Sequence, residues 1–404
     1  MDREQGLAAV IDRELISDCV HCGFCLPTCP TYGPLWQEEM DSPRGRIHLM
    51  SSLLDETISL SATTVQHFDR CLGCMACVTS CPSGVQYDRL IEQTRAHVEE
   101  HYDRPFGERL QRALVFSTVP YPRRLRLALA LTPPRLPGRL RPFAALKPPW
   151  RSSERPPDLT PAVGKRRARV GLLLGCVQRV VFGDVNAATA RVLAAEGCDI
   201  VVPRSQGCCG ALHLHAGRYA DGRRRAERIG ELFAGLDAVV VNAAGCGSHL
   251  KDAELGVRVV DVNELLAELG PQARRRPLAL KVAYQDACHL GHAQGIRDAP
   301  RALLASIPEL ELVEPAEQAI CCGSAGIYNL TQPAPARELG ERKAANVLAT
   351  GANVYAAANP GCLVQVSTYL RRSGRRLPAV HPVELLDSSI RGLGRFRVLT
   401  SARR

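Results

Sequence analysis

From Ala168 onward, short apolar runs alternate with longer amphipathic stretches, which is the pattern of an α/β fold. The first half of this region predicts strands at 170–174, 199–202 and 238–241, and helices at 186–196 and 223–233. The second half repeats the order, with strands expected at 280–284, 310–313 and 353–357 and helices at 299–306 and 334–348. We therefore expect a duplicated, pseudo-symmetric α/β body with two lobes.

Cysteines follow the expected strands of each half at matching places. The spacings are 32 and then 37 residues in the first half, and 33 and then 40 in the second. Because loops at strand ends can gather side chains, we expect a further thiolate site, for a third iron–sulfur centre or another cofactor, in each lobe or in the pair together. Buried, redox-inert cysteines are the alternative. The first lobe set is Cys176, Cys208, Cys209 and Cys246, and the second lobe set is Cys288, Cys321, Cys322 and Cys362.

Two further cysteine runs lie near the N-terminus. Both obey C-x2-C-x2-C-x3-C-P and they begin 52 residues apart, at Cys19 and Cys71. This is the run of bacterial two-cluster ferredoxins, in which the fourth cysteine binds the other cluster. We thus expect two [4Fe–4S] clusters. The first N-terminal set is Cys19, Cys22, Cys25 and Cys81, and the second N-terminal set is Cys71, Cys74, Cys77 and Cys29.

Zinc is the alternative occupant of these runs, although its usual signature is two well-separated C-x2-C pairs. The histidines beside the cysteines, His21, His249, His289 and His292, fit surface or core positions better than ligand positions. Between the runs, Ser42 and Pro43 predict the cap and first turn of a helix. Arg44 and Arg46 then face either the clusters or a partner, or only begin that helix.

The chain has 404 residues, which is enough for two or three domains, and 17 cysteines. Dense cysteine in a reducing compartment indicates metal ligation rather than disulfides. No secretory signal and no membrane-spanning apolar run is evident, so we expect a cytoplasmic protein. We expect an α+β fold: a largely helical, ferredoxin-like two-cluster domain at 1–103, a connector at 104–167, and cysteine-rich α/β repeats at 168–270 and 271–404.

The net charge of +10 is concentrated in the connector. Between Arg104 and Pro161 there are twelve Lys or Arg against three Asp or Glu, and twelve of the 28 prolines. Such a segment suits docking to an acidic partner or to the anionic face of a membrane. A solvated, flexible linker is the alternative. With few aromatic residues and no recognised motif, nucleic-acid binding is not expected.

The motifs Cys-Val-His-Cys-Gly-Phe-Cys, Ser-Pro-Arg-Gly-Arg-Ile and Cys-Pro-Ser-Gly-Val together resemble the iron–sulfur subunit of bacterial glycolate oxidase. Gly-Cys-Cys-Gly-Ala and Cys-Cys-Gly-Ser-Ala-Gly extend the resemblance over nearly the whole chain. The cysteine repeats also resemble those in subunits of heterodisulfide reductase and of anaerobic glycerol-3-phosphate dehydrogenase, and those in lactate-utilisation proteins. They depart from the C-x2-C of heterodisulfide reductase at Cys246-Gly-Ser-His249 and Cys362-Leu-Val-Gln365.

The resemblance implies an electron-transfer subunit in a membrane-associated complex. Flavin-binding partner subunits would oxidise glycolate to glyoxylate, and this chain would relay the electrons to membrane quinone from the inner face of the membrane. The sequence has no G-x-G-x-x-G turn or phosphate loop, so we expect no flavin or nicotinamide on it and no activity from it alone. A lactate or glycerol-3-phosphate dehydrogenase subunit and a thiol/disulfide reductase are the alternatives.

Overall fold

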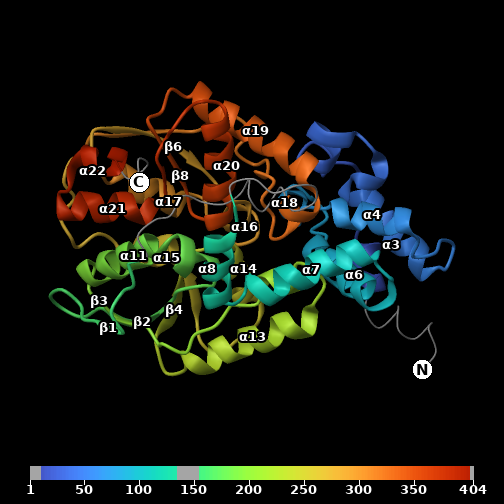
Figure 1. The fold of residues 1–404 in the computed structure, drawn as a ribbon, viewed down its shortest axis with the longest axis horizontal. Coiled ribbons are helices and arrows are strands. Elements are labelled where there is room, and N and C mark those ends of the chain that lie inside the picture. Colours follow the sequence, from blue (N-terminus) through green and yellow to red (C-terminus); the bar gives the residue numbers. More distant parts are fainter. Residues whose placement is uncertain (1–10, 134–153, 401–404) are drawn as a thin grey trace.

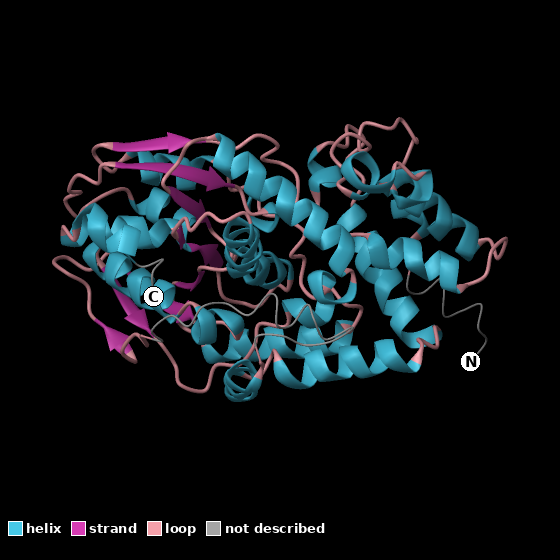
Figure 2. Cartoon of the chain, turned by 45° about the horizontal axis from the view of Figure 1, so that its top comes forward, coloured by secondary structure: helices cyan, strands magenta, loops and turns pink. Residues whose placement is uncertain are grey.

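The computed structural model describes residues 11–133 and 154–400, as a helical N-terminal domain beside two lobes that each contain a sheet (Figures 1 and 2). Ile47, Met50, Phe68, Leu90 and Ile91 form the core of the N-terminal domain. The predicted helix start is confirmed, since Ser42 Oγ accepts the Gly45 N–H at 3.0 Å. The helices of this domain are α2 (Arg13–Ser17), η1 (Thr31–Trp36), η2 (Glu39–Asp41), α3 (Pro43–Leu54), α4 (Ala62–Arg70), α5 (Ala76–Thr79) and α6 (Tyr87–His101).

The connector begins with two helices, α7 (Phe106–Thr118) and α8 (Pro122–Leu131), which pack on the rest of the molecule. Val115, Phe116 and Leu125 are buried there. Arg104 is buried too and donates to Asp69 at 2.6 Å. A solvated linker is therefore wrong for residues 104–133, and the rest of the connector up to residue 153 lies outside the described residues.

The sheet of the first lobe has the strand order β1-β3-β2-β4-β5. All pairs are parallel except the β1–β3 edge. The three strands predicted here are confirmed within two residues. The strands are β1 (Leu159–Thr160), β2 (Ala168–Leu173), β3 (Cys198–Val201), β4 (Ala238–Val241) and β5 (Val259–Asp261). The helices are α10 (Val177–Val181), α11 (Gly183–Ala195), α12 (Ala211–Leu214), α13 (Tyr219–Leu232), α14 (Ala244–Asp252) and α15 (Val262–Leu269).

The second lobe repeats this topology. Its parallel order β7-β6-β8-β9 corresponds strand by strand to β3-β2-β4-β5, so the predicted duplication is confirmed. The strands are β6 (Leu280–Gln285), β7 (Leu310–Val313), β8 (Val354–Ala357) and β9 (Ala379–Val380). The helices are α16 (Cys288–Gly291), α17 (Asp298–Ala305), α18 (Tyr328–Thr331), α19 (Pro333–Ala349), α20 (Pro360–Arg372), α21 (Pro382–Arg391) and α22 (Gly394–Thr400).

The two lobes share one apolar core, and α11 packs against α21 across their interface. Arg191 on α11 donates to Asp387 on α21 at 2.8 Å. The duplication extends to helix caps. Asp261 caps α15 after β5, and His381 caps α21 after β9, each with a glutamate that completes a capping box.

The Asp261 cap gives a stability prediction. Burial raises the pKa of this carboxyl to about 6, above its ordinary 3.8, so its ionisation opposes folding increasingly as pH rises from about 4 to 6. Asp261→Asn keeps an N-cap acceptor without the charge, so we expect it to be at least as stable as the parent at pH 7. Asp261→Ala should lose about 1 kcal/mol relative to Asn. Unfolding midpoints of the variants and the parent at pH 5 and pH 8 measure this. If the stability of Asp261→Asn relative to the parent does not increase from pH 5 to pH 8, the prediction is contradicted.

Candidate metal centres

The first lobe set comes together at one edge of its sheet. Cys176 follows β2, Cys208 and Cys209 follow β3, and Cys246 lies in α14 after β4. This edge holds the carboxyl ends of parallel strands, where α/β folds bind ligands. Hydrogen bonds from the Cys176 and Cys209 thiols lower the pKa of Cys208 well below its ordinary value, and Cys209 in turn contacts Cys246.

The second lobe set is arranged in the same way. Cys321 contacts both Cys288 and Cys322, and Cys322 contacts Cys362. The hydrogen bond from Cys321 lowers the pKa of Cys288 and, with one from Cys362, that of Cys322. All eight cysteines predicted in the lobes are thus brought together as two sets of four.

All seventeen cysteines lie in the described part of the chain, and none of them forms a disulfide bond. The seventeenth, Cys198, belongs to no set. It lies on β3 with no solvent exposure, and burial raises its pKa to about 11. Cys198 is a small apolar core residue.

The first N-terminal set lies at the surface. Cys22 is exposed, and Val20 and Phe24 beside it are 68% and 67% exposed. Burial, with smaller contributions from the charges of Cys81 and Cys22, raises the pKa of Cys19, so these three thiols are neighbours. Burial also raises the pKa of Cys25 to about 11.

The second N-terminal set is buried. Burial raises the pKa of Cys77 well above its ordinary value, and the charges of Cys74, Cys71 and Cys29 add to that effect. Two hydrogen-bond donors reach this set: the Gly73 N–H lies 3.3 Å and the Tyr87 hydroxyl 3.6 Å from Cys71 Sγ. The Thr31 hydroxyl lies 3.1 Å from Cys29 Sγ and donates to the Asp41 carbonyl at 2.7 Å.

Arg44 and Arg46 serve different sets. Arg44 pairs with Glu39 at 2.7 Å and donates to the His21 carbonyl, next to the first N-terminal set. Arg46 is 1% exposed and lies beneath the second set, where it donates to Thr31 Oγ1 at 3.1 Å and to Asp41 at 3.3 Å. Burial would raise the pKa of Cys71, but the charges of Arg46 and Arg95 lower it overall.

The second N-terminal set adjoins the second lobe set. Leu72, Cys74 and Ala76 pack in one buried cluster with Cys321 and Tyr328. Burial raises the pKa of Cys74 well above its ordinary value, and the nearby thiolate of Cys288 raises it further.

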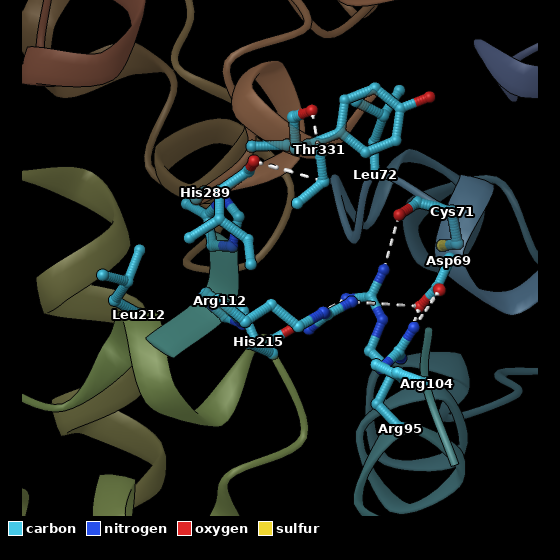
Figure 3. Close-up of a pocket in the computed structure, with 15 residues that line it drawn as sticks. Asp69, Cys71, Leu72, Arg95, Arg104, Arg112, Leu212, His215, His289 and Thr331 are labelled. Carbon is cyan, nitrogen blue, oxygen red and sulfur yellow. Dashed lines mark hydrogen bonds and ion pairs between the residues drawn. The ribbon is translucent and has the colours of Figure 1, made fainter. Parts of the chain in front are cut away.

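A cavity of about 50 Å³ lies between the N-terminal domain and both lobes (Figure 3). Asp69, Cys71 and Arg95 line it on one side, and His215 and His289 on the other. Arg95 bridges the two sides, because it donates to the carbonyls of Cys71 and His215. The cavity has room for a few water molecules.

Three of the histidines that lie beside cysteines in the sequence have different surroundings. His249 is a core residue, 4% exposed. His289 Nδ1 lies 3.5 Å from Cys288 Sγ, and His292 Nδ1 lies 2.8 Å from the Thr79 hydroxyl. Among the described residues, no three His, Cys, Asp or Glu side chains converge as a single metal ion would require. A cubane places each thiolate on a different iron, so its ligands surround a cluster rather than one ion.

Comparisons with known proteins assign these regions to domain families. A 4Fe-4S dicluster domain model matches residues 15–85, and a cysteine-rich domain model matches residues 170–251 and 282–367. The chain is 36% identical to a probable glycolate oxidase iron-sulfur subunit of Bacillus subtilis, over 93% of this chain and 94% of that protein. The chain belongs to the family of glycolate oxidase iron–sulfur subunits. It is an iron–sulfur electron-transfer subunit with a 4Fe-4S dicluster domain and two cysteine-rich domains.

Other similar proteins support this family assignment or share the fold. The glycolate oxidase iron-sulfur subunit of Escherichia coli is 33% identical, over 96% of this chain and 98% of that protein. Lactate utilization protein A of Oceanobacillus iheyensis is 26% identical, over 55% of this chain and 98% of that protein. A crystal structure of a hypothetical protein from Helicobacter pylori has a TM-score of 0.56 at 10% identity, over 96% of this chain and 77% of that chain, and so shares the fold alone.

Exchange of the fourth ligands between the N-terminal sets gives a second prediction. Cys29 is the fourth cysteine of the first run but lies among the thiols of the second set. Cys81, the fourth cysteine of the second run, lies beside Cys19. Cys81→Ser should therefore change the cluster of the first run, and Cys29→Ser that of the second. EPR spectra of the reduced, anaerobically purified variants distinguish the two signals. Damage confined to the run that carries the substitution would contradict the exchange, and Cys198→Ser, outside all four sets, is the control.

Proposed function

We propose that this subunit takes electrons one at a time from a flavin-containing partner that oxidises glycolate to glyoxylate, and passes them to a membrane acceptor, for which quinone is the leading candidate. The observation that carries the proposal is the contact between the buried second N-terminal set and the second lobe set, in a chain of this family. That contact joins two cysteine-rich regions into one path.

The proposed ligands are the four sets of cysteines. The first and second N-terminal sets would each hold a [4Fe–4S] cluster, which supplies one-electron chemistry when bound. The lobe sets fit a further iron–sulfur centre, because each offers four thiols of which at least one has a lowered pKa. A lowered pKa favours the thiolate, which is the form that binds metal.

The difference in solvent exposure between the two N-terminal sets supports an order for the proposed electron path. Cys22 is exposed and stands between the exposed side chains of Val20 and Phe24, so the first N-terminal set is where a partner's flavin could approach. The second set is enclosed by the N-terminal domain and the second lobe, so it would receive electrons from within the chain. The flavin would stay on the partner subunits, and the chain would be inactive without them.

The proposed site of membrane contact is the pair of helices α7 and α8. Phe106, Leu110 and Leu114 recur every four residues on α7 and are exposed, as are Leu127 and Leu131 on α8. Arg109, Arg123, Arg124 and Arg126 are exposed on the same helices. Apolar side chains among arginines fit an anionic lipid surface. In the described part of the chain, no helix is long and apolar enough to cross a bilayer.

The test of the proposed function is EPR of the anaerobically purified complex before and after glycolate is added. Reduced [4Fe–4S] signals should appear on addition, because glycolate electrons would reach this subunit. Signals with lactate or glycerol 3-phosphate but not with glycolate would refute the substrate and keep the relay. Disulfide reduction by the isolated chain, without flavin partners, would refute the relay in favour of a thiol reductase.

Membrane contact gives a separate prediction. Leu127→Glu with Leu131→Glu should reduce the membrane-bound fraction of the complex about tenfold or more, because burial of each leucine contributes about 1.5–3 kcal/mol. Fractionation and liposome sedimentation measure the effect. The matched control is Leu159→Glu with Val163→Glu, since these exposed apolar residues lie on the first lobe, at 57% and 62% exposure. Equal losses in both double variants, or none in the first, would contradict a role for α8.

A further inference from the structure

Two guanidinium groups and one carboxylate lie next to the second N-terminal set and carry a net positive charge. Arg46 and Asp41 are buried, and the side chain of Arg70 is 22% exposed. The carboxylate of Asp41 has no solvent exposure and accepts hydrogen bonds from Arg46 at 3.3 Å and from Arg70 at 2.7 Å. The His67 ring lies 3.0 Å from the same carboxylate. Two guanidinium groups therefore face one carboxylate, and Arg46, the more buried of them, interacts with both Cys71 and Cys29.

Tyr328 approaches the same set from the second lobe. It is 4% exposed, and its hydroxyl has no hydrogen-bond partner among the described residues. Burial raises the pKa of this hydroxyl, so it keeps its proton, and the charges nearest to it include Arg46, Cys71 and Cys321. A buried donor without an acceptor costs about 1–3 kcal/mol. The sulfur atoms of a cluster held by the second set would be hydrogen-bond acceptors for the Tyr328 hydroxyl, which has no acceptor among the described residues.

Among the residues that the structure describes, neither feature is found at the first N-terminal set. Its nearest guanidinium, that of Arg44, is neutralised by Glu39 at 2.7 Å. Cys22 is exposed, so water screens the charge of this set. The two sets thus have the same ligands but different electrostatic surroundings.

We propose that Arg46 and Tyr328 make the second N-terminal set the higher-potential of the two, so that each electron moves from the surface set towards the second lobe. The proposal rests on the proposed relay and gives it a direction. Transfer of one electron would oxidise a cluster held by the first set and reduce a cluster held by the second set by that same electron. No proton moves and no covalent bond changes.

The physical reason is charge. A cluster held by four thiolates is anionic and becomes more negative by one charge on reduction. Burial alone opposes that added charge. The cation of Arg46 and the hydroxyl of Tyr328 stabilise it, since hydrogen bonds to sulfur and nearby charge set the potential of such clusters. Arg46 and Tyr328 are positioning residues, because they act on the set without binding iron.

The test is a redox titration of the anaerobic complex with mediators, followed by EPR. Tyr328→Phe removes only an unpartnered hydroxyl, so the variant should fold. We expect it to lower the higher of the two N-terminal potentials, with about a fivefold smaller reduced-to-oxidised ratio at the parent midpoint, and to leave the lower potential unchanged. Tyr369→Phe is the matched control, because Tyr369 is a buried second-lobe tyrosine whose charged neighbours are arginines and a glutamate rather than cysteines.

Arg46 supplies the second arm. Arg46→Gln should lower the same potential further, and Arg46→Lys should restore most of it. If Arg46 had only a structural role, the potential would not depend on whether the substituted side chain is charged. The proposal is overturned if the surface set has the higher potential, as identified by Cys81→Ser, or if Tyr328→Phe and Arg46→Gln leave the higher potential unchanged. The titration uses no glycolate, so its outcome is independent of the substrate and of the flavin partner.

Discussion

The removal of the second N-terminal set from water is the constraint on which the arrangement of the domains depends. Buried thiolates are costly unless opposite charge and hydrogen-bond donors accompany them. Arg46 supplies charge from within the N-terminal domain, and Arg95 adds charge while it binds the carbonyl of His215 in the first lobe. The residue that helps to stabilise the thiolate of Cys71 therefore also holds the N-terminal domain against the body.

A second constraint, the parallel sheet, explains how cysteines far apart in the sequence come together. The carboxyl ends of β2, β3 and β4 meet at one edge, so the loops after them need no special path to gather Cys176, Cys208 and Cys246. The equivalent strand order in the second lobe gathers its set in the same way. In each lobe, two sequence spacings between cysteines determine how the set is gathered. A single gene duplication could therefore copy the whole arrangement.

These constraints also explain how far the sequence could predict the structure. The strands and the gathering of cysteines follow from periodicity and spacing, which are local. Arg44 and Arg46 are two residues apart on a helix and so point in different directions, but which of them is buried depends on the packing of α3 against α4. The importance of Tyr328 could not be predicted from the sequence, because Arg46 and Cys71, whose charges act on its hydroxyl, lie in another domain. The packing of α7 and α8 does not follow from the sequence, because prolines and arginines outnumber the buried apolar residues Val115, Phe116 and Leu125 in this segment.

Docking breaks the symmetry that duplication created. The N-terminal domain meets the second lobe through Cys74 beside Cys288, whereas it meets the first lobe through Glu92, which lies 3.3 Å from His215. The closely packed turn at Gly217 leaves little room there, since a Cβ would lie 2.3 Å from the carbonyl of Arg95. Cysteine therefore faces cysteine at only the second of these interfaces within the described residues. Two lobes of common origin can thus have unequal roles, because position relative to the N-terminal domain, and not the cysteine pattern, decides which one would come next in the proposed path.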